Sequence, residues 1–254
     1  MSDTLTLEAP AARADRLDAA FRALDLPGRL RLLRDSIDGR IVFTTSFGLE
    51  DQVIAHALFG AGLDIEVVTL DTGRLFPETY RVWSETEAKY GRRIRALYPK
   101  AEALEALVAD QGIDGFYFGI DMRKACCGVR KVEPLARALS GARAWITGLR
   151  ADQSAHRSGL GFVEFDAARD LVKANPIFDW TREDARLFAE REGVPVNALH
   201  AQGFLSIGCA PCTRALQPGE PERAGRWWWE SEAQKECGLH VSSDGTLVRA
   251  AQGK

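Results

Sequence analysis

Five cysteines carry the strongest chemical signal in this sequence of 254 residues. Cys126 and Cys127 are adjacent, Cys209 and Cys212 form a Cys-Ala-Pro-Cys pair, and Cys237 stands alone near the C-terminus. Two close pairs and a singleton indicate four thiolates at one metal centre and one thiol left for chemistry. Because the two pairs lie far apart in the sequence, a folded domain must bring them together. Buried structural thiols remain the alternative, since free cysteines are often core residues.

The composition is that of an ordinary globular protein. Hydrophobic residues make up 46% and charged residues 27% of the chain, and the formal net charge is −3. This balance gives no indication of bulk nucleic-acid or membrane binding, so an anionic ligand must be met by local clusters of Arg and Lys. The N-terminal stretch carries acidic residues and no long apolar core, which predicts neither a secretory signal nor a transmembrane segment. We therefore expect a cytoplasmic, reducing location, where an odd number of cysteines favours metal binding or catalysis over disulfides.

Apolar and β-branched runs predict at least four buried strands that alternate with helices. The strands are expected at residues 41–45, 66–70, 94–98 and 144–148, with a shorter candidate at 171–173. Helical spacing of leucines predicts two helices in the first forty residues, separated at Pro27-Gly28, and further helices that open at Leu49 and Pro77. Alternating strands and helices favour an α/β fold, with a largely parallel sheet covered on both faces.

Four polar clusters follow these strands or flank the cysteines. In such a sheet, ligands bind beyond the carboxyl ends of the strands, near the point where the strand order reverses. The hydroxyl-rich turn at residues 44–48 can cradle a phosphate with its N–H groups, and the turn at residues 70–73 can contact a ribose or base. Arg150 follows the fourth strand and suits an anion, and the basic stretch at residues 123–131 can hold a sulfate near the thiolates. The candidate residues in the three turns are Thr45, Ser46, Phe47, Gly48, Leu70, Asp71, Thr72, Gly73, Gly148 and Arg150.

Each cluster taken alone has a plainer explanation, namely a helix cap, a capped turn or a solvated loop. Their joint occurrence in this order, however, resembles the assimilatory sulfonucleotide reductases, in particular the adenylyl-sulfate (APS) reductases that carry a [4Fe-4S] cluster. The resemblance spans roughly residues 44–240, most of the chain. It rests on the motifs Ser46-Phe47-Gly48-Leu49-Glu50-Asp51, Leu70-Asp71-Thr72-Gly73, Lys124-Ala125-Cys126-Cys127, Thr147-Gly148-Leu149-Arg150, Cys209-Ala210-Pro211-Cys212 and Glu236-Cys237-Gly238-Leu239-His240. The adjacent cysteine pair with a distant Cys-x-x-Cys discriminates most, because reductases of the 3′-phosphorylated nucleotide generally lack those four cysteines.

The resemblance implies a fold, a cofactor and a set of substrate contacts. The fold would be the three-layer, adenine nucleotide α-hydrolase-like sandwich, in which the Ser46-Phe47-Gly48 turn suits binding a nucleotide without splitting its α–β bond. Lys131 would lie near the cluster and the substrate sulfate, and Arg223 and Arg226 would contact the phosphosulfate. The cluster ligands would be Cys126, Cys127, Cys209 and Cys212.

Cys237 is the expected nucleophile. A thiolate that attacks the sulfonyl sulfur of APS expels AMP and leaves a Cys S-sulfonate, and a second thiol then releases sulfite by exchange chemistry. That second thiol must come from outside, because the other four are committed to the cluster, so thioredoxin or glutaredoxin is the expected donor. Lys235 and His240 flank Cys237 and could favour its thiolate by charge proximity.

The sequence predicts one α/β domain over residues 1–229, opened by a helical segment at 1–38, and a mobile tail over 230–254 that carries Cys237. The resemblance also allows a homo-oligomer. Three alternatives stay open: a reductase of 3′-phosphoadenylyl sulfate or of both nucleotides, a tRNA thiolation enzyme of the same superfamily, and a non-catalytic zinc-stabilised nucleotide-binding module. Pyrophosphatase relatives in the superfamily carry a Ser-Gly-Gly loop where this sequence reads Ser46-Phe47-Gly48. The absence of that loop and the acidic overall balance disfavour the tRNA enzyme.

Overall fold

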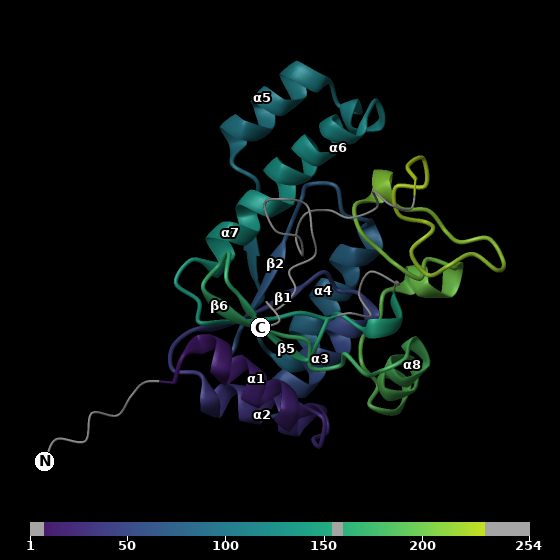
Figure 1. Ribbon diagram of the computed structural model, residues 1–254. Coiled ribbons are helices and arrows are strands. Elements are labelled where there is room, and N and C mark those ends of the chain that lie inside the picture. The colour runs from purple at the N-terminus through teal and green to yellow at the C-terminus, as the bar shows by residue number, and fades with distance from the viewer. Residues whose placement is uncertain (1–7, 154–159, 232–254) are drawn as a thin grey trace, which may run out of the picture.

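A six-stranded sheet forms the centre of the molecule. The computed structural model describes residues 8–153 and 160–231 (Figure 1). The strands are β1 (Ile41–Thr45), β2 (Glu66–Leu70), β3 (Arg95–Leu97), β4 (Ala144–Ile146), β5 (Val163–Asp166) and β6 (Leu171–Ala174). Their order across the sheet is β3-β2-β1-β4-β6-β5, and every pair is parallel except the edge pair of β5 and β6. β2 and β3 lie on one side of β1, whereas β6 and β5 lie on the far side of β4. The strand order therefore reverses between β1 and β4.

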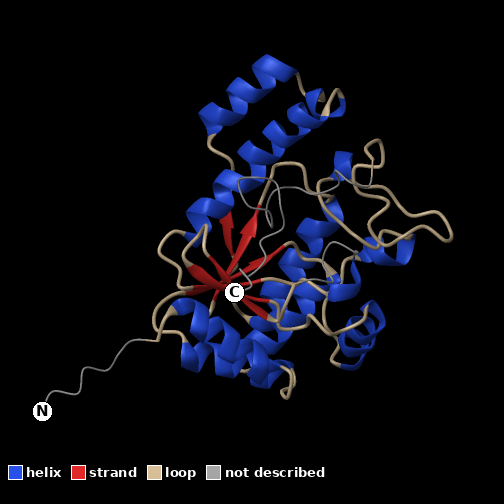
Figure 2. Cartoon of the chain, viewed as in Figure 1, coloured by secondary structure: helices blue, strands red, loops and turns tan. Residues whose placement is uncertain are grey.

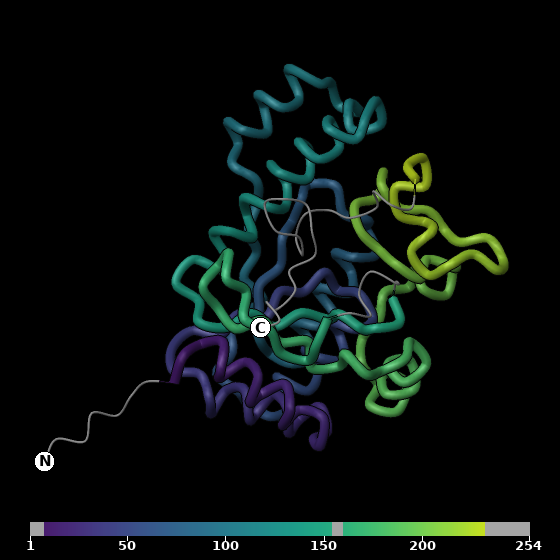
Figure 3. Tube along the Cα trace, in the orientation of Figure 1, coloured from purple at the N-terminus to yellow at the C-terminus, as the bar shows by residue number. Residues whose placement is uncertain are grey.

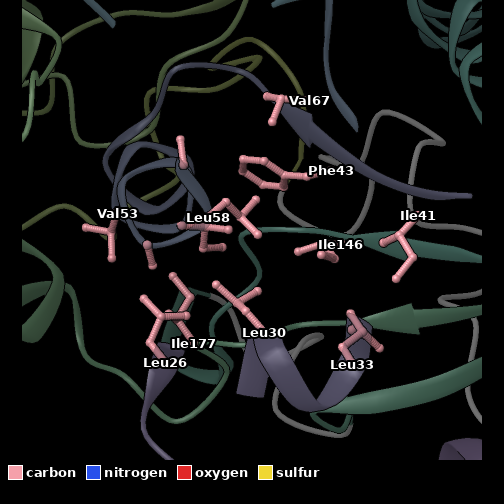
Figure 4. Close-up of a cluster of buried hydrophobic side chains, with 14 of the residues drawn as sticks. Leu26, Leu30, Leu33, Ile41, Phe43, Val53, Leu58, Val67, Ile146 and Ile177 are labelled. Atoms are coloured by element: carbon pink, nitrogen blue, oxygen red, sulfur yellow. The ribbon is translucent and has the colours of Figure 1, made fainter. Parts of the chain in front are cut away.

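One face of the sheet is covered by five helices and holds the larger apolar core. These helices are α1 (Pro10–Phe21), α2 (Leu26–Ser36), α3 (Leu49–Gly60), α4 (Pro77–Tyr90) and α8 (Arg182–Arg191). Figure 4 shows Leu30 and Leu33 of α2 beside Ile41, Phe43 and Ile146 of the sheet, all at most 1% exposed. Burial of this many aliphatic side chains is the main favourable term that holds the layer in place.

The opposite face packs against α7 (Glu133–Leu139) and holds a smaller core. Leu135 and Leu139 of α7 meet Val42, Val68 and Trp145 of the sheet in this cluster. Helices α5 (Ala101–Gln111) and α6 (Ile120–Cys127) extend beyond the sheet at one end of the molecule, and α5 buries none of its residues (Figure 2). Helices therefore lie on both faces, as the sequence predicts for an α/β sandwich.

The last part of the described chain lies away from the N-terminal helices. Figure 3 shows the purple N-terminal helices at one side and the yellow segment that ends near residue 231 at another, beside the loop between α5 and α6. Two short 3₁₀ turns, Ala198–Gln202 and Ala210–Cys212, interrupt this final segment. In the described ranges, no helix is both long enough and apolar enough to cross a membrane.

Two details differ from the sequence prediction. The break between the first two helices falls at residues 22–25 and not at Pro27-Gly28. Asp25 caps α2 by accepting the Gly28 N–H at 2.8 Å, and Pro27 sits in the first turn of that helix, where its missing N–H costs nothing. The second difference is β5, whose alternation of apolar and acidic residues was not recognised as a strand. The four strand predictions and the shorter candidate at 171–173 are confirmed. The bounds of β1 and β2 match the prediction, and those of β3, β4 and β6 differ by one or two residues.

Candidate functional site

A cavity of about 220 Å³ opens beyond the carboxyl ends of β1, β2 and β4. It lies at the reversal of the strand order, where a doubly wound sheet leaves a crevice between diverging connections. Nine of the predicted ligand-binding residues line it: Thr45, Ser46, Gly48, Leu70, Thr72, Lys131, Gly148, Arg223 and Arg226. Phe47, Asp71, Gly73 and Arg150 were predicted with them, and they are not among its lining residues.

Phe47 fixes the turn between β1 and α3, because its side chain points away from the cavity into the core. Phe47 has φ 59°, a left-handed conformation that costs a non-glycine residue free energy, and its ring is buried against Trp83 with 5.4 Å between centroids. Its N–H donates to Thr45 Oγ1 at 3.0 Å. The buried ring therefore anchors the strained turn, while Ser46 and Gly48 on either side face the cavity.

Asp51, in the first turn of α3, holds the same turn in place by hydrogen bonds to Ser46. Its Oδ2 accepts the Ser46 N–H at 2.6 Å and the Ser46 hydroxyl at 2.7 Å. Burial raises the pKa of Asp51 to about 7, against the opposing effect of the two Ser46 hydrogen bonds. A Cβ at position 148 would lie only 2.4 Å from Asp51 Oδ1, so the close approach of the β4 turn to this carboxyl group requires Gly148.

The turn after β2 links the strand-end side of the larger cavity to the cysteines. Asp71 accepts the Gly73 N–H and the Tyr80 hydroxyl, each at 2.8 Å, so its carboxylate holds the turn in shape. Thr72 Oγ1 lies 3.3 Å from Cys209 Sγ, and the Thr72 carbonyl accepts from Arg130 at 2.6 Å. Asp71 and Gly73 thus build this turn, and Thr72 is the member that reaches the site.

Arg150 has a different environment from the one the sequence predicts. Its side chain is fully buried, and its guanidinium donates to Glu50 at 2.9 Å, to both carboxylate oxygens of Glu222 at 2.8 and 2.9 Å, and to Asp152. Arg150 therefore binds carboxylates of the protein itself, and this arrangement does not support its expected contact with an anionic ligand. The local sequence gave no sign of this, because Glu222 lies 72 positions further along the chain.

A continuous helical rod carries the adjacent cysteines and the basic residues that follow them. Helix α6 ends at Cys127, a π-helical turn spans Gly128–Val132, and α7 begins at Glu133. Pro134, inside this rod, has no N–H to give to the carbonyl four residues earlier, which favours the wider π turn just before it. The π turn brings Arg130 and Lys131, both buried, to the same side of the molecule as the cysteines.

All four cysteines of the two pairs line one small cavity, although the pairs are far apart in sequence. Cys126, Cys127, Cys209 and Cys212 share it with four cationic side chains, those of Arg74, Arg123, Arg130 and Lys131. The four thiols are free of disulfide bonds. Lys131 and Cys209 also line the larger cavity, so the two spaces meet at these residues. The sequence prediction that the fold unites the two pairs is confirmed.

The four thiols differ in their ease of ionisation. Burial raises the pKa of the Cys212 thiol to about 12 and also raises the pKa of Cys126, in each case with help from the neighbouring Cys209. Burial would raise the pKa of Cys209 too, but Lys131, the Thr72 hydroxyl and Arg226 outweigh it and hold this pKa below its ordinary value. Cationic groups and a hydroxyl donor thus favour a thiolate at the position where the two cavities meet.

The donor set fits a thiolate-bound iron–sulfur group. Within residues 8–153 and 160–231, no three Cys, His, Asp or Glu side chains stand close enough together to hold a single metal ion. A cluster makes a different demand, because each cysteine binds a separate iron and the sulfurs stand farther apart than on one ion. Four thiols around one cavity, bordered by four cations that would offset the charge of thiolates, meet that demand chemically.

The segment from Glu222 to Glu230 joins the two cavities. Arg226 forms a β-bridge with Thr213, directly after Cys212, and the Trp227 N–H donates to the Cys212 carbonyl at 3.1 Å. The guanidiniums of Arg226 and Arg123 lie 4.7 and 4.8 Å from the centroid of the Trp227 ring, which is buried. Trp227 therefore packs in the core of the site and fixes the arginine beside it.

Several functional neighbours were not found by sequence reasoning. Glu222 and His200 line the cavity, Gly208 leaves room for Arg226, and Glu230 forms a buried ion pair with Arg123, a member of the predicted basic stretch. Only Gly208, immediately before Cys209, carried a signal that could have been read. Cys237, Lys235 and His240 lie outside the described residues, so their predicted roles stay predictions. Only residues 230 and 231 of the predicted tail at 230–254 are described, and the Glu230 side chain is buried against Arg123, so the mobility of the tail stays a prediction.

Comparison with known proteins places this architecture in a family. Residues 40–215 match the phosphoadenosine phosphosulfate reductase domain. The chain is 53% identical over 244 residues to the adenosine 5′-phosphosulfate reductase of Sinorhizobium fredii (strain USDA 257), covering 96% of this chain and 97% of that protein. It is 51% identical over 200 residues to the protein of the same name from Allochromatium vinosum, covering 79% of this chain and 78% of that protein.

A solved structure agrees with the fold. The crystal structure of phosphoadenylyl-sulfate reductase from Candida auris, a phosphate complex, superposes with a TM-score of 0.69 at 26% identity and covers 79% of this chain and 96% of that chain. The fold, the cavity at the strand ends and these sequence matches together show that the chain belongs to the phosphoadenosine phosphosulfate reductase domain family.

Proposed function

We propose that this protein reduces adenosine 5′-phosphosulfate to sulfite and AMP with electrons from a thiol donor, in assimilatory sulfate reduction. The observation that carries the proposal is the union of two cavities at Lys131 and Cys209, one built from nucleotide-binding turns and one from cysteines and cations. The curated relatives that are about half identical over nearly their whole length bear the name of this reductase.

The larger cavity has the polarity that such a nucleotide needs. Gly48 caps the N-terminus of α3, and the Ser46 hydroxyl, which donates to Asp51, can still accept a hydrogen bond at the strand ends. Lys131, Arg223 and Arg226 line the side that meets the cysteines and can bind a phosphosulfate by charge-assisted hydrogen bonds. In this pose the adenosine lies along the ends of β1, β2 and β4, and the sulfonyl group faces Cys209 and Lys131.

The reaction needs one nucleophilic thiol besides those of the two pairs, and Cys237 is that thiol in our proposal. Its thiolate attacks the sulfonyl sulfur, the bond from sulfur to the bridging oxygen breaks, and AMP leaves with the electron pair. Lys131, Arg223 and Arg226 would stabilise the negative charge that develops on the leaving phosphate. An external thiolate then attacks Cys237 Sγ, and sulfite departs with the pair of the cleaved sulfur–sulfur bond.

We assign the [4Fe-4S] group to Cys126, Cys127, Cys209 and Cys212, because these thiols share one cavity. When bound, the group would supply an inorganic centre that organises this end of the cavity electrostatically. The side chains of Arg74, Arg123, Arg130 and Lys131 would offset the negative charge of the thiolates around it. Iron and sulfide content, measured in anaerobically purified protein and in Cys209→Ser, tests this assignment, and a zinc-bound colourless protein would contradict it.

Steady-state kinetics test the overall reaction. Anaerobically purified protein is given APS or its 3′-phosphorylated form, with thioredoxin, thioredoxin reductase and NADPH, and sulfite release is measured. We expect sulfite from APS, a higher kcat/KM for APS than for the 3′-phosphorylated nucleotide, and none from Cys237→Ser. A preference for the 3′-phosphorylated nucleotide would replace the proposed substrate, and absence of sulfite from both would reject the activity.

A further inference from the structure

We propose that an exposed aromatic patch, made of Ile113, Tyr117, Phe118 and Trp228, is the docking surface for the dithiol redoxin that releases sulfite from Cys237. This inference rests on the function proposed above, which needs a protein thiol donor. Among the described residues, eight large apolar side chains are exposed, and these four lie in two segments that touch each other. The other four, Tyr80, Tyr98, Leu187 and Val196, lie on other elements of the molecule.

Edge-to-face contacts between aromatic rings connect Tyr117 to Trp228 within the patch. The rings of Tyr117 and Trp228 lie 6.4 Å apart, and that of Trp229 lies 4.5 Å from Tyr117 and 4.8 Å from Trp228. Phe118, which follows Tyr117, is 77% exposed, the highest value among these apolar residues. Figure 1 shows the loop between α5 and α6 beside the yellow segment that ends the described chain. The large exposed rings are the kind of side chain that anchors a protein interface.

The patch lies directly over the cysteine end of the site. The Tyr117 hydroxyl donates to the Pro211 carbonyl at 2.6 Å, inside the Cys209–Cys212 loop. Phe116, next to Tyr117, is buried in one cluster with Cys209, Cys212 and Trp227. A protein bound to this patch would therefore contact the same structural unit that holds the two cysteine pairs.

The chain that leads to Cys237 starts from this patch and is firmly anchored there. Glu230, two residues after Trp228, binds Arg123 at 2.7 and 2.9 Å, and the two side chains are 3% and 1% exposed. Cys237 follows Glu230 by seven positions, and a fully extended chain of that length spans at most about 25 Å. A redoxin that attacks Cys237 Sγ must then bind within about that distance of Glu230, where the patch offers exposed apolar surface.

The connecting sequence favours a separate protein as the occupant. Residues 232–236 read Glu-Ala-Gln-Lys-Glu, with a single small apolar side chain, so the sequence that follows the patch offers little to cover three large aromatic side chains and an isoleucine. The half-reaction itself requires a partner that arrives and leaves in each turnover, and transient complexes of this kind bury small surfaces centred on a few aromatic anchors. A patch of four side chains matches that scale.

The step that the docking serves is balanced in atoms and electrons. The redoxin thiolate attacks Cys237 Sγ, the bond between Sγ and the sulfonate sulfur breaks, and sulfite leaves with its electron pair. The mixed disulfide is then opened by the second redoxin thiol, which releases Cys237 as a thiolate and leaves the redoxin oxidised. The patch contributes to the first of these attacks only, by holding the redoxin near Cys237.

The test compares a protein reductant with a small one. We would measure turnover at saturating APS with thioredoxin or with dithiothreitol as donor for the parent protein, Phe118→Ser, and Phe118→Ser combined with Trp228→Ala. Leu187→Ser, on α8 and similarly exposed, is the matched control, and Phe118→Leu is the conservative variant. Iron content and S-sulfonate formation from APS alone, followed by intact mass, report on folding and on the first half-reaction.

We expect the double variant to lose at least about tenfold in kcat/KM for thioredoxin, with dithiothreitol-driven turnover and S-sulfonate formation within about twofold of the parent. Leu187→Ser should retain the thioredoxin dependence of the parent, and Phe118→Leu most of it. Unchanged thioredoxin dependence in the double variant would overturn the assignment, and so would an equal loss with both reductants. A changed sedimentation coefficient with unchanged thioredoxin kinetics would assign the patch to a second copy instead. A parent that forms no S-sulfonate would reject the proposed function itself.

Discussion

The two ends of the site are built in different ways. The nucleotide end is formed by turns at the carboxyl ends of parallel strands, and its carboxylates are held by internal partners: Asp51 by Ser46, and Glu50 and Glu222 by Arg150. The cysteine end lies outside the sheet, on the α6–α7 rod and on the Cys209–Cys212 and 222–230 segments. It has four thiols and four cationic side chains around one cavity.

In the proposed function, this difference assigns recognition of the nucleotide to one end of the site and thiol chemistry to the other. At the nucleotide end, charge is balanced within the protein and the backbone is fixed by the sheet, so that end suits binding a ligand by shape and hydrogen bonds. At the cysteine end, Arg123 and Arg74 pair with Glu230 and Asp114. Arg130 and Lys131 lie beside thiols, which become negative only when they ionise. We therefore expect variants of the two ends to affect different measurements.

The largest effect is expected at Lys131, where the two ends meet. Lys131→Ala removes the cation shared by both cavities and should lower kcat by about 100-fold to 1,000-fold, the range found when a preorganised charge is removed from a developing anion. Iron content should stay close to that of the parent, because the four cysteines remain. Steady-state rates and iron assays on the same preparation provide the comparison, and Lys131→Arg should recover part of the activity. Parallel loss of iron and activity would assign Lys131 to cluster retention instead.

The buried ion pair at the cysteine end should matter for stability. Glu230→Gln leaves the Arg123 guanidinium buried without its carboxylate, and we expect the free energy of unfolding to fall by about 3 kcal/mol. Glu133→Gln breaks solvent-exposed pairs with Arg137 and Lys100 and should cost less than about 1 kcal/mol. Urea unfolding of both variants measures the difference. Equal stability losses would show that the Arg123–Glu230 pair does not anchor the chain that leads to Cys237.

At the nucleotide end, Asp51 predicts a pH dependence of stability. Because its pKa rises from 3.8 to about 7 on folding, Asp51 is protonated in the native protein where it is ionised in the unfolded chain, and its contribution is lost as pH increases through 7. The free energy of unfolding should therefore fall by about 2 kcal/mol between about pH 5 and about pH 8 through this group alone. Asp51→Asn should remove that part of the slope in denaturant titrations. A variant with the same pH slope as the parent would mean that Asp51 is ionised throughout.

Substitutions at two glycines, one at each end of the site, should have the smallest effects on activity and should change different kinetic parameters. An added Cβ at Gly148 would lie 2.4 Å from Asp51 Oδ1, and one at Gly208 would lie 2.3 Å from a guanidinium nitrogen of Arg226. Gly148→Ala should raise the KM for APS by about tenfold without loss of iron, because it distorts the nucleotide end. Gly208→Ala should act mainly on kcat, by about threefold to tenfold, since a flexible arginine can partly adjust. If both variants changed the same parameter to the same extent, the separation of the two ends would fail.

The sequence was sufficient to predict what depends on local pattern. The β-branched runs at 41–45 and 66–70 predicted β1 and β2, and the two close cysteine pairs predicted that the fold brings them together, as the cavity they share shows. Each run and each pair is a property of a few neighbouring residues. The role of the four cysteines as ligands of one centre stays a prediction. The edge strand β5 was missed because it has only four residues and two of them, Glu164 and Asp166, are acidic types that are depleted in strands. Pairing with β6 holds this segment in the sheet, and both acidic side chains are buried there.

The remaining features depend on contacts between distant segments. The local sequence of an arginine that follows a strand is the same whether its side chain binds a ligand or carboxylates of the protein. Only the fold brings Glu222 to Arg150. In the same way, the sequence around Phe47 does not show that Trp83 lies behind its ring, nor does Arg123 show that Glu230 lies beside it. The aromatic patch exists only because residues 113–118 and 228 meet across the cysteine loop.

The division between four sulfurs that bind iron and one that accepts the sulfonyl group is tested most directly by intact mass. Anaerobically purified protein is mixed with APS in the absence of any reductant and weighed. The account predicts a gain of one sulfonate per chain, absent in Cys237→Ser and removed when thioredoxin is added. A Cys237→Ser protein that still gains the sulfonate, or that releases sulfite at the parent rate, would contradict it.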